Sequence, residues 1–231
     1  MTVMAMVLGE GEPAAGPWQV MQLTQLARML IPGPRTWLGR PRVLAVDGRS
    51  GSGKTTLAGR LQGVVPASAV VHTDDIAWNQ AMFDWADLLT SGILEPVHRN
   101  EHVSYRPTAW EQRSRNGAIE VPRNSDLVII EGAGAARREL MAMVDTVIWV
   151  QSDLAEAERR GIERDGGDEA AIAFWHLWMA EELPFMACQQ PWTRAGIIVA
   201  GTPPVPHDPA TEIVTAQPPQ PATGRTASAS P

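Results

Sequence analysis

The segment from Val43 to Leu61 reads VLAVDGRSGSGKTTLAGRL. It contains the pattern GxxxxGK[ST] from Gly48 to Thr55, with an apolar strand-like run before it and a helical pattern after it. Glycines let backbone N–H groups curl around phosphate oxygens, and the N-terminal end of the following helix adds a positive dipole. The segment therefore predicts a loop that binds nucleotide phosphates. Its expected contacts are Gly48, Ser50, Gly51, Ser52, Gly53, Lys54, Thr55 and Thr56.

Three side chains of this loop have distinct expected roles. Lys54 is expected to reach the β- and γ-phosphates, and the hydroxyl of Thr55 to hold magnesium. Thr56 is expected near the α-phosphate. The predicted cofactors are ATP and Mg²⁺, although a loop that contacts phosphates does not distinguish ATP from GTP.

Short β-branched runs alternate with helix-length segments along the chain. The runs lie at 43–46, 69–72, 127–130, 146–150 and 196–200. Strands separated in this way are typical of a parallel sheet covered by helices on both faces. We expect an α/β fold, a P-loop NTPase three-layer α/β/α sandwich with a five-stranded parallel sheet.

The ends of the chain differ in composition from its middle. Residues 1–17 are rich in Gly, Pro and Ala, which predicts a flexible N-terminal segment, and residues 18–31 have the apolar spacing of a helix. Residues 202–231 are dominated by Pro, Ala, Thr and Ser, which predicts a disordered tail. The nucleotide-binding domain is therefore expected to span 18–201.

Composition restricts the class of partner. The formal net charge of -7 argues against a general nucleic-acid binder, which needs a surplus of basic residues. The single cysteine, Cys188, excludes an internal disulfide and is consistent with a reducing compartment, so we expect a cytoplasmic protein. No apolar run approaches the length of a membrane span. A homo-oligomer is left open.

Two carboxylate positions follow strand-like runs. The segment VVHTDDIAW places Asp74 and Asp75 after one run, and LVIIEG places Glu131 after another. Ligands of α/β proteins bind at the carboxyl ends of parallel strands. Asp74 or Asp75 could accept the proton of a substrate hydroxyl, or could only cap a helix. Glu131 is expected to hold magnesium, directly or through water.

Basic residues follow the fourth strand-like run. Arg160 and Arg164 are four residues apart and therefore share one face of a helix. Guanidinium groups on a helix that leads into the glycines at 166 and 167 are suited to close over phosphates. We expect a short lid near 160–168, with both arginines in catalytic roles beside Lys54.

Taken together, these motifs resemble the uridine kinase and phosphoribulokinase branch of P-loop kinases, which has a nucleoside-monophosphate-kinase-like core. The similarity covers roughly residues 40–200, through the phosphate loop and the motifs TDDIAW, FDW, YRP, VIIEG, RRGIERD and IIVAGT. The resemblance implies that Asp74 is the catalytic base. The Phe and Tyr that follow it in uridine kinases are replaced here by Ile76 and Ala77.

The resemblance also implies residues that contact the acceptor. Asp84 corresponds to a sugar-contacting aspartate and Tyr105 to a base-contacting tyrosine, while Trp110 stands where a histidine is expected. Trp78 and Trp85 are aromatic neighbours of these positions and could line the acceptor pocket together with Trp110. Filling the core is an equal alternative for these tryptophans.

The motifs predict an ATP-dependent kinase that transfers the γ-phosphoryl group to a hydroxyl of a nucleoside-like small molecule. One alternative is a kinase of a non-nucleoside acceptor such as a sugar, a vitamin precursor or an antibiotic, which the replacements at Ile76, Ala77 and Trp110 favour. Another alternative is an ATPase or nucleotide-dependent switch. Against a GTPase switch, the sequence has no NKxD segment of the kind that reads guanine.

Overall fold

The computed structural model describes residues 6–32 and 39–218. The helices and strands follow in the order β1 (Gln19–Gln22), α1 (Leu23–Leu30), β2 (Arg42–Gly48), α2 (Lys54–Val64), β3 (Ser68–His72), α3 (Thr73–Ala77), α4 (Ala86–Leu89), η2 (Thr90–Leu94), α5 (Glu95–His98), β4 (Val103–Tyr105), α6 (Thr108–Gln112), β5 (Ile119–Val121), β6 (Leu127–Glu131), η3 (Arg138–Met143), β7 (Thr146–Gln151), α7 (Leu154–Arg164), α8 (Glu169–Gln189), η4 (Pro191–Arg194), β8 (Ile197–Ala200) and β9 (Glu212–Ala216).

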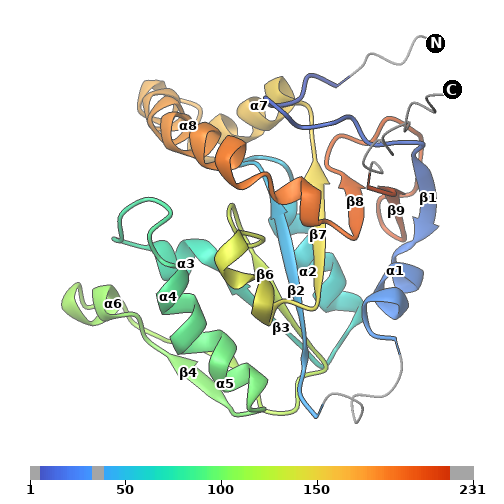
Figure 1. The fold of residues 1–231 in the computed structure, drawn as a ribbon. Coiled ribbons are helices and arrows are strands. Elements are labelled where there is room, and N and C mark those ends of the chain that lie inside the picture. The colour runs from blue at the N-terminus through green and yellow to red at the C-terminus, as the bar shows by residue number, and fades with distance from the viewer. Residues whose placement is uncertain (1–5, 33–38, 219–231) are drawn as a thin grey trace, which may run out of the picture.

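The main sheet has seven strands in the order β1-β9-β8-β7-β2-β6-β3 (Figure 1). The strands from β8 to β3 pair in parallel, and they coincide with the five apolar runs of the sequence. The α/β expectation is thus confirmed, but the sheet is not purely parallel and has seven strands instead of five. Strands β9 and β1 extend it by antiparallel pairing.

Both faces of the sheet are covered, because neighbouring residues of a strand point to opposite sides. Leu44 and Val46 of β2 belong to one buried cluster with Leu26 of α1 and Leu61 of α2. The opposite face carries a second cluster, in which Val43 and other strand residues pack with the elements between β3 and β6 and with α8. The result is the expected three-layer arrangement.

The chain ends depart from the sequence prediction at two places. Residues 19–22, expected as the start of a helix, form strand β1 beside β9. Within the expected disordered tail, Ile213 and Val214 are buried in strand β9. Full burial of one such side chain contributes about 1.5–3 kcal/mol, which offsets the roughly 1–2 kcal/mol that ordering a residue costs. Residues 219–231 of that tail lie outside the described residues.

The N-terminal segment was expected to be flexible, and residues 1–5 of it lie outside the described range. Residues 6–17 contain no helix or strand, but Glu12 and Ala15 form hydrogen bonds with side chains of β7. Glu12 is only 8% exposed and accepts hydrogen bonds from Trp149 Nε1 at 2.7 Å, Gln151 Nε2 at 3.0 Å and Arg49 Nε at 3.2 Å. Composition could not predict this docking, because the partners of Glu12 come from distant strands and from the phosphate loop.

No helix within the described residues is long and apolar enough to cross a lipid bilayer.

Candidate active site

The phosphate loop joins β2 to α2 at the carboxyl edge of the parallel strands. Two of its glycines are required by the backbone: Gly51 has φ of 74° and Gly53, the residue before α2, has φ of 100°. A side chain on Gly51 would also run into the carbonyl oxygen of Ala157. The local sequence therefore folds into a tight loop that leads directly into the N-terminus of a helix.

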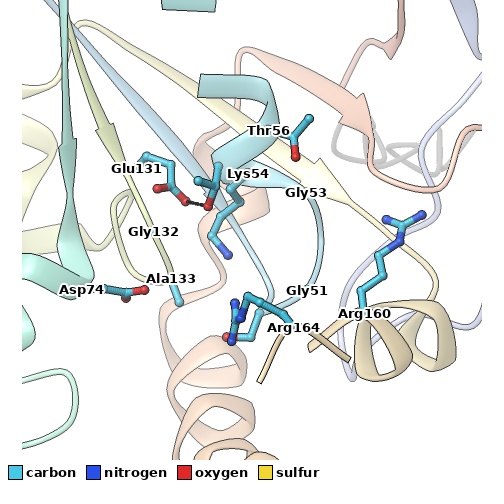
Figure 2. A pocket seen from close by; sticks show the side chains of 12 residues that line it. Gly51, Gly53, Lys54, Thr56, Asp74, Glu131, Gly132, Ala133, Arg160 and Arg164 are labelled. Atoms are coloured by element: carbon cyan, nitrogen blue, oxygen red, sulfur yellow. Dashed lines mark hydrogen bonds between the residues drawn. The ribbon is translucent and has the colours of Figure 1, made fainter. Parts of the chain in front are cut away.

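A pocket of about 210 Å³ lies over this loop (Figure 2). Lys54 is buried and its Nζ donates a hydrogen bond to the carbonyl oxygen of Arg49 at 2.8 Å. Both lid arginines reach the same pocket. It is lined by Ser50, Gly51, Gly53, Lys54, Thr55, Thr56, Asp74, Glu131, Gly132, Ala133, Arg160 and Arg164.

The two arginines are held differently. Arg160 donates to Glu156 Oε1 at 2.7 Å and to the carbonyl oxygen of Gly201 at 2.8 Å. Arg164 pairs with Asp165 at 2.8 and 3.0 Å, and this hydrogen bond raises the pKa of the Arg164 guanidinium. Both side chains therefore carry positive charge to the pocket from helix α7.

Glu131 forms a hydrogen-bonded group with two neighbours at the ends of β6, β3 and α2. Its Oε1 accepts from Thr55 Oγ1 at 3.0 Å, and its Oε2 lies 2.6 Å from His72 Nδ1. Burial raises the pKa of Glu131, but the His72 hydrogen bond and the Lys54 and His72 charges outweigh it, so the pKa lies below its usual value. The hydrogen bond to Glu131 raises the pKa of His72 above its usual value.

This group fits a magnesium ion, because a carboxylate and a hydroxyl oxygen from different elements lie within hydrogen-bonding distance at the phosphate pocket. His72, at the end of β3, has Glu131 as its hydrogen-bond partner. The sheet register places the two residues side by side, since His72 pairs with Glu131 across β3 and β6.

Asp74 and Asp75 have different surroundings, although they are neighbours in helix α3. Asp74 lines the phosphate pocket, and burial raises its pKa against the opposing charge of Lys54. Asp75 instead forms an ion pair with Arg115 at 2.5 Å, and its carbonyl oxygen accepts from Trp110 Nε1 at 2.9 Å. Only Asp74 of the pair faces the lysine.

A second pocket, of about 450 Å³, adjoins the first; we call it the aromatic pocket. It shares Ser50, Asp74 and Arg164 with the phosphate pocket. Aromatic rings from α8 and from the residue after α3 form much of its wall. It is lined by Ser50, Asp74, Ala77, Trp78, Asn79, Arg164, Asp165, Phe174, Trp175 and Trp178.

A third pocket, of about 320 Å³, adjoins the phosphate pocket through Gly53, Thr56 and Arg160. Its walls come from β8, β9, α2 and the connection after β8. It is lined by Ser52, Gly53, Thr56, Leu57, Arg60, Val150, Arg160, Val199, Ala200, Gly201, Pro203, His207, Ile213 and Val214. The three pockets therefore form a series with the phosphate loop in the middle.

Four expected acceptor residues line neither the phosphate pocket nor the aromatic pocket. Trp85 is 2% and Trp110 4% exposed, and each packs against an arginine: Arg137 lies 5.4 Å from the ring centroid of Trp85, and Arg115 lies 3.7 Å from that of Trp110. The other two are Tyr105, whose ring covers Gly92, and Asp84, which is exposed.

Sequence reasoning missed two parts of the site. It did not assign Phe174, Trp175 or Trp178 of α8 to a pocket, although α8 has apolar residues all around it. Trp175 and Trp178 also pack: Trp175 is 6% exposed with its ring over Gly161, and Trp178 lies against the core. Sequence reasoning also passed over Asp47, which is fully buried and accepts hydrogen bonds from the backbone N–H groups of Gly48, Gly134 and Ala136. Burial raises the pKa of Asp47 to about 6.

Asp47 connects the phosphate loop to the loop after β6. Its hydrogen bonds to Gly134 and Ala136 measure 3.1 and 2.8 Å, and that to Gly48 measures 2.7 Å. Three N–H donors on one buried carboxylate hold the two loops in a fixed relation. The position of Glu131 and Gly132 over the phosphate pocket therefore depends on a residue that precedes the motif.

Comparison with known proteins agrees with this fold. A possible uridine kinase from Bacillus stearothermophilus is 20% identical, with a TM-score of 0.52 over 76% of this chain and 96% of that one. A proposed fructose transport system kinase from Silicibacter sp. TM1040 is 22% identical, with a TM-score of 0.55 over 74% of this chain and 94% of that one. No family model and no curated protein matches the sequence. The resemblance to P-loop kinases is thus confirmed at the level of the fold.

Proposed function

We propose that this chain is an ATP-dependent kinase that phosphorylates a hydroxyl of a small molecule bound in the aromatic pocket. The observation that carries the proposal is the sharing of Asp74 and Arg164 between the phosphate pocket and the aromatic pocket. A base and a cation at this junction stand where an acceptor hydroxyl would meet the transferring phosphate.

In this proposal the phosphate loop determines the orientation of the bound ATP. Thr56, the expected contact of the α-phosphate, also lines the third pocket, so the nucleoside of ATP would lie there, against Pro203 and His207. The γ-phosphate would then lie at the opposite end, beside Lys54 and Asp74. The acceptor approaches that end from the aromatic pocket.

In the proposed reaction the acceptor oxygen attacks the γ-phosphorus, and its proton passes to the carboxylate of Asp74. The bond between the γ-phosphorus and the β,γ-bridging oxygen breaks, and ADP leaves with the electron pair. Lys54, Arg160 and Arg164 neutralise charge on the phosphates, which is the larger part of catalysis in phosphoryl transfer. Thr55 and Glu131 would hold magnesium, which supplies further neutralisation when bound.

A nucleoside-like acceptor fits the flat rings of the aromatic pocket, on which a base could stack. The placement of Asp84 and Tyr105, the residues that match acceptor contacts of uridine kinases, favours the second candidate, a non-nucleoside acceptor. Asp84, Trp85, Tyr105 and Trp110 do not line the aromatic pocket. One structural neighbour is described as a sugar-transport kinase, which agrees with this candidate.

The test is ADP release from ATP and magnesium across a panel of nucleosides, sugars, vitamin precursors and aminoglycosides. We expect one compound class to stimulate release in the wild type and not in Asp74→Asn. Asp75→Asn is the matched control, because its carboxylate is paired with Arg115. Slow release that no compound changes would support the ATPase or switch reading instead.

A further inference from the structure

Glu182 is a fully buried carboxylate in the middle of helix α8, with 0% of its surface exposed. Its Oε1 accepts from the backbone N–H of Ser50 at 3.0 Å, and its Oε2 accepts from Ser50 Oγ at 2.6 Å. Oε2 also accepts from Trp178 Nε1 at 2.7 Å, and this N–H lies 2.8 Å from Ser50 Oγ. The three residues form a closed hydrogen-bonded triangle.

The triangle lies at the boundary between two pockets. Ser50 lines both the phosphate pocket and the aromatic pocket, and Trp178 lines the aromatic pocket. Glu182 lines neither, so its carboxylate is a support behind the two walls. It ties a phosphate-loop residue to an aromatic side chain 128 positions later in the chain.

The carboxylate of Glu182 is hydrogen-bonded by groups that carry no formal charge. Within residues 6–32 and 39–218, no basic side chain forms an ion pair with it. Among the residues that the structure describes, the carboxylate accepts hydrogen bonds from the N–H and O–H groups of Ser50 and the N–H group of Trp178 alone. A phosphate that arrives beside Ser50 would repel this carboxylate and draw on the same donors.

We propose that Glu182 is a positioning residue that couples occupation of the phosphate loop to the position of Trp178 in the aromatic pocket. The proposal rests on the proposed function, because it assumes that a nucleotide binds at the loop. A triphosphate shifts Ser50, Glu182 follows through its hydrogen bonds to Ser50, and the indole of Trp178 moves with Glu182. Nucleotide binding thereby sets the position of the Trp178 indole, which forms part of the wall of the acceptor pocket.

The experiment uses ¹⁹F NMR of the full chain labelled with 5-fluorotryptophan, with the Trp178 resonance assigned from Trp178→Phe. We expect a non-hydrolysable ATP analogue with magnesium to shift this resonance in the wild type. In Glu182→Gln the shift is expected to fall several-fold, because an amide offers one acceptor oxygen where the carboxylate offers two. Calorimetry measures binding of the analogue to each protein in parallel.

Two further variants make the test specific. Glu181→Gln changes an exposed neighbour in the same way and should keep the wild-type response. Ser50→Ala removes the hydroxyl contact but keeps the backbone N–H contact, so it should reduce the shift of the Trp178 resonance in part. This variant replaces Glu182→Gln as the test if Glu182→Gln does not fold.

The outcomes separate the two proposals. If the analogue does not bind to the wild type, the proposed function fails and the coupling with it. If the analogue binds but leaves the Trp178 resonance in place, only the coupling is overturned. An undiminished shift in Glu182→Gln, or in Ser50→Ala if the former is unfolded, also overturns the coupling and leaves the proposed function intact.

Discussion

The phosphate loop and the aromatic pocket share a boundary but are built in different ways. The loop comes from one continuous segment, in which β2, the glycines and the first turn of α2 place every backbone donor. The aromatic pocket combines residues 74–79 with residues 164–178 and borrows Ser50 from the loop. A short motif can specify the first site, whereas the second exists only because α8 packs across the sheet edge.

The largest effect should come from the loop. Lys54→Ala removes the one ammonium group that faces the expected γ-phosphate, and we expect turnover to fall by at least about 10³-fold. Calorimetry with ADP and magnesium, together with ADP release, checks both binding and chemistry. Lys54 is also the only lysine in the sequence, so ATP should protect a single site from amine acylation. Acylation that ATP does not slow would contradict its assigned place.

At the boundary, Asp74→Asn should lower kcat by about 10²–10⁴-fold, the usual contribution of a general base. ATP binding should change little, because the loop donors remain. The Asp75→Asn variant should keep most of the wild-type activity, since Asp75 pairs with Arg115 and does not line the phosphate pocket. Equal rates in Asp74→Asn and the wild type would remove Asp74 from the mechanism.

The pH profile tests the same carboxylate. Burial raises the pKa of Asp74, and a base must be deprotonated to act. We therefore expect kcat/KM to rise about tenfold per pH unit below the pKa of Asp74 and to level off above it. This limb should lie at higher pH than for an ordinary aspartate. It should disappear in Asp74→Asn, and a limb that survives there belongs to another group.

The smallest effect should come from the aromatic pocket. Phe174 lines this pocket and is 50% exposed, so Phe174→Ala should raise the KM of the acceptor by up to about tenfold, corresponding to the loss of one stacking contact, with the KM of ATP nearly unchanged. Trp85→Phe and Trp110→Phe are the matched comparison, because both tryptophans are buried away from that pocket. They should lower the melting temperature and leave the acceptor KM within about twofold. A reversed pattern would place the acceptor beside the start of α4 and α6 instead.

Most of the parallel sheet could be predicted from the sequence, because each buried strand is a short β-branched run with few alternatives. The extra strands could not. Strand β9 lies in a segment of Pro-rich composition, and its pairing with β1 joins residues near opposite ends of the chain. Such pairing depends on long-range register, which no local pattern records.

The sequence by itself determined the phosphate loop and the placement of Glu131 at a strand end. These features depend on residues that are close together in the chain, so the local backbone conformation and the order of the strands are sufficient to predict them. Tertiary structure alone decided which aspartate faces Lys54, which tryptophans form a pocket, and that Glu12 and Glu182 hold Arg49 and Ser50 from distant segments. The physical reason is that burial and hydrogen-bond partners depend on contacts between distant segments, which the residue pattern of one segment does not contain.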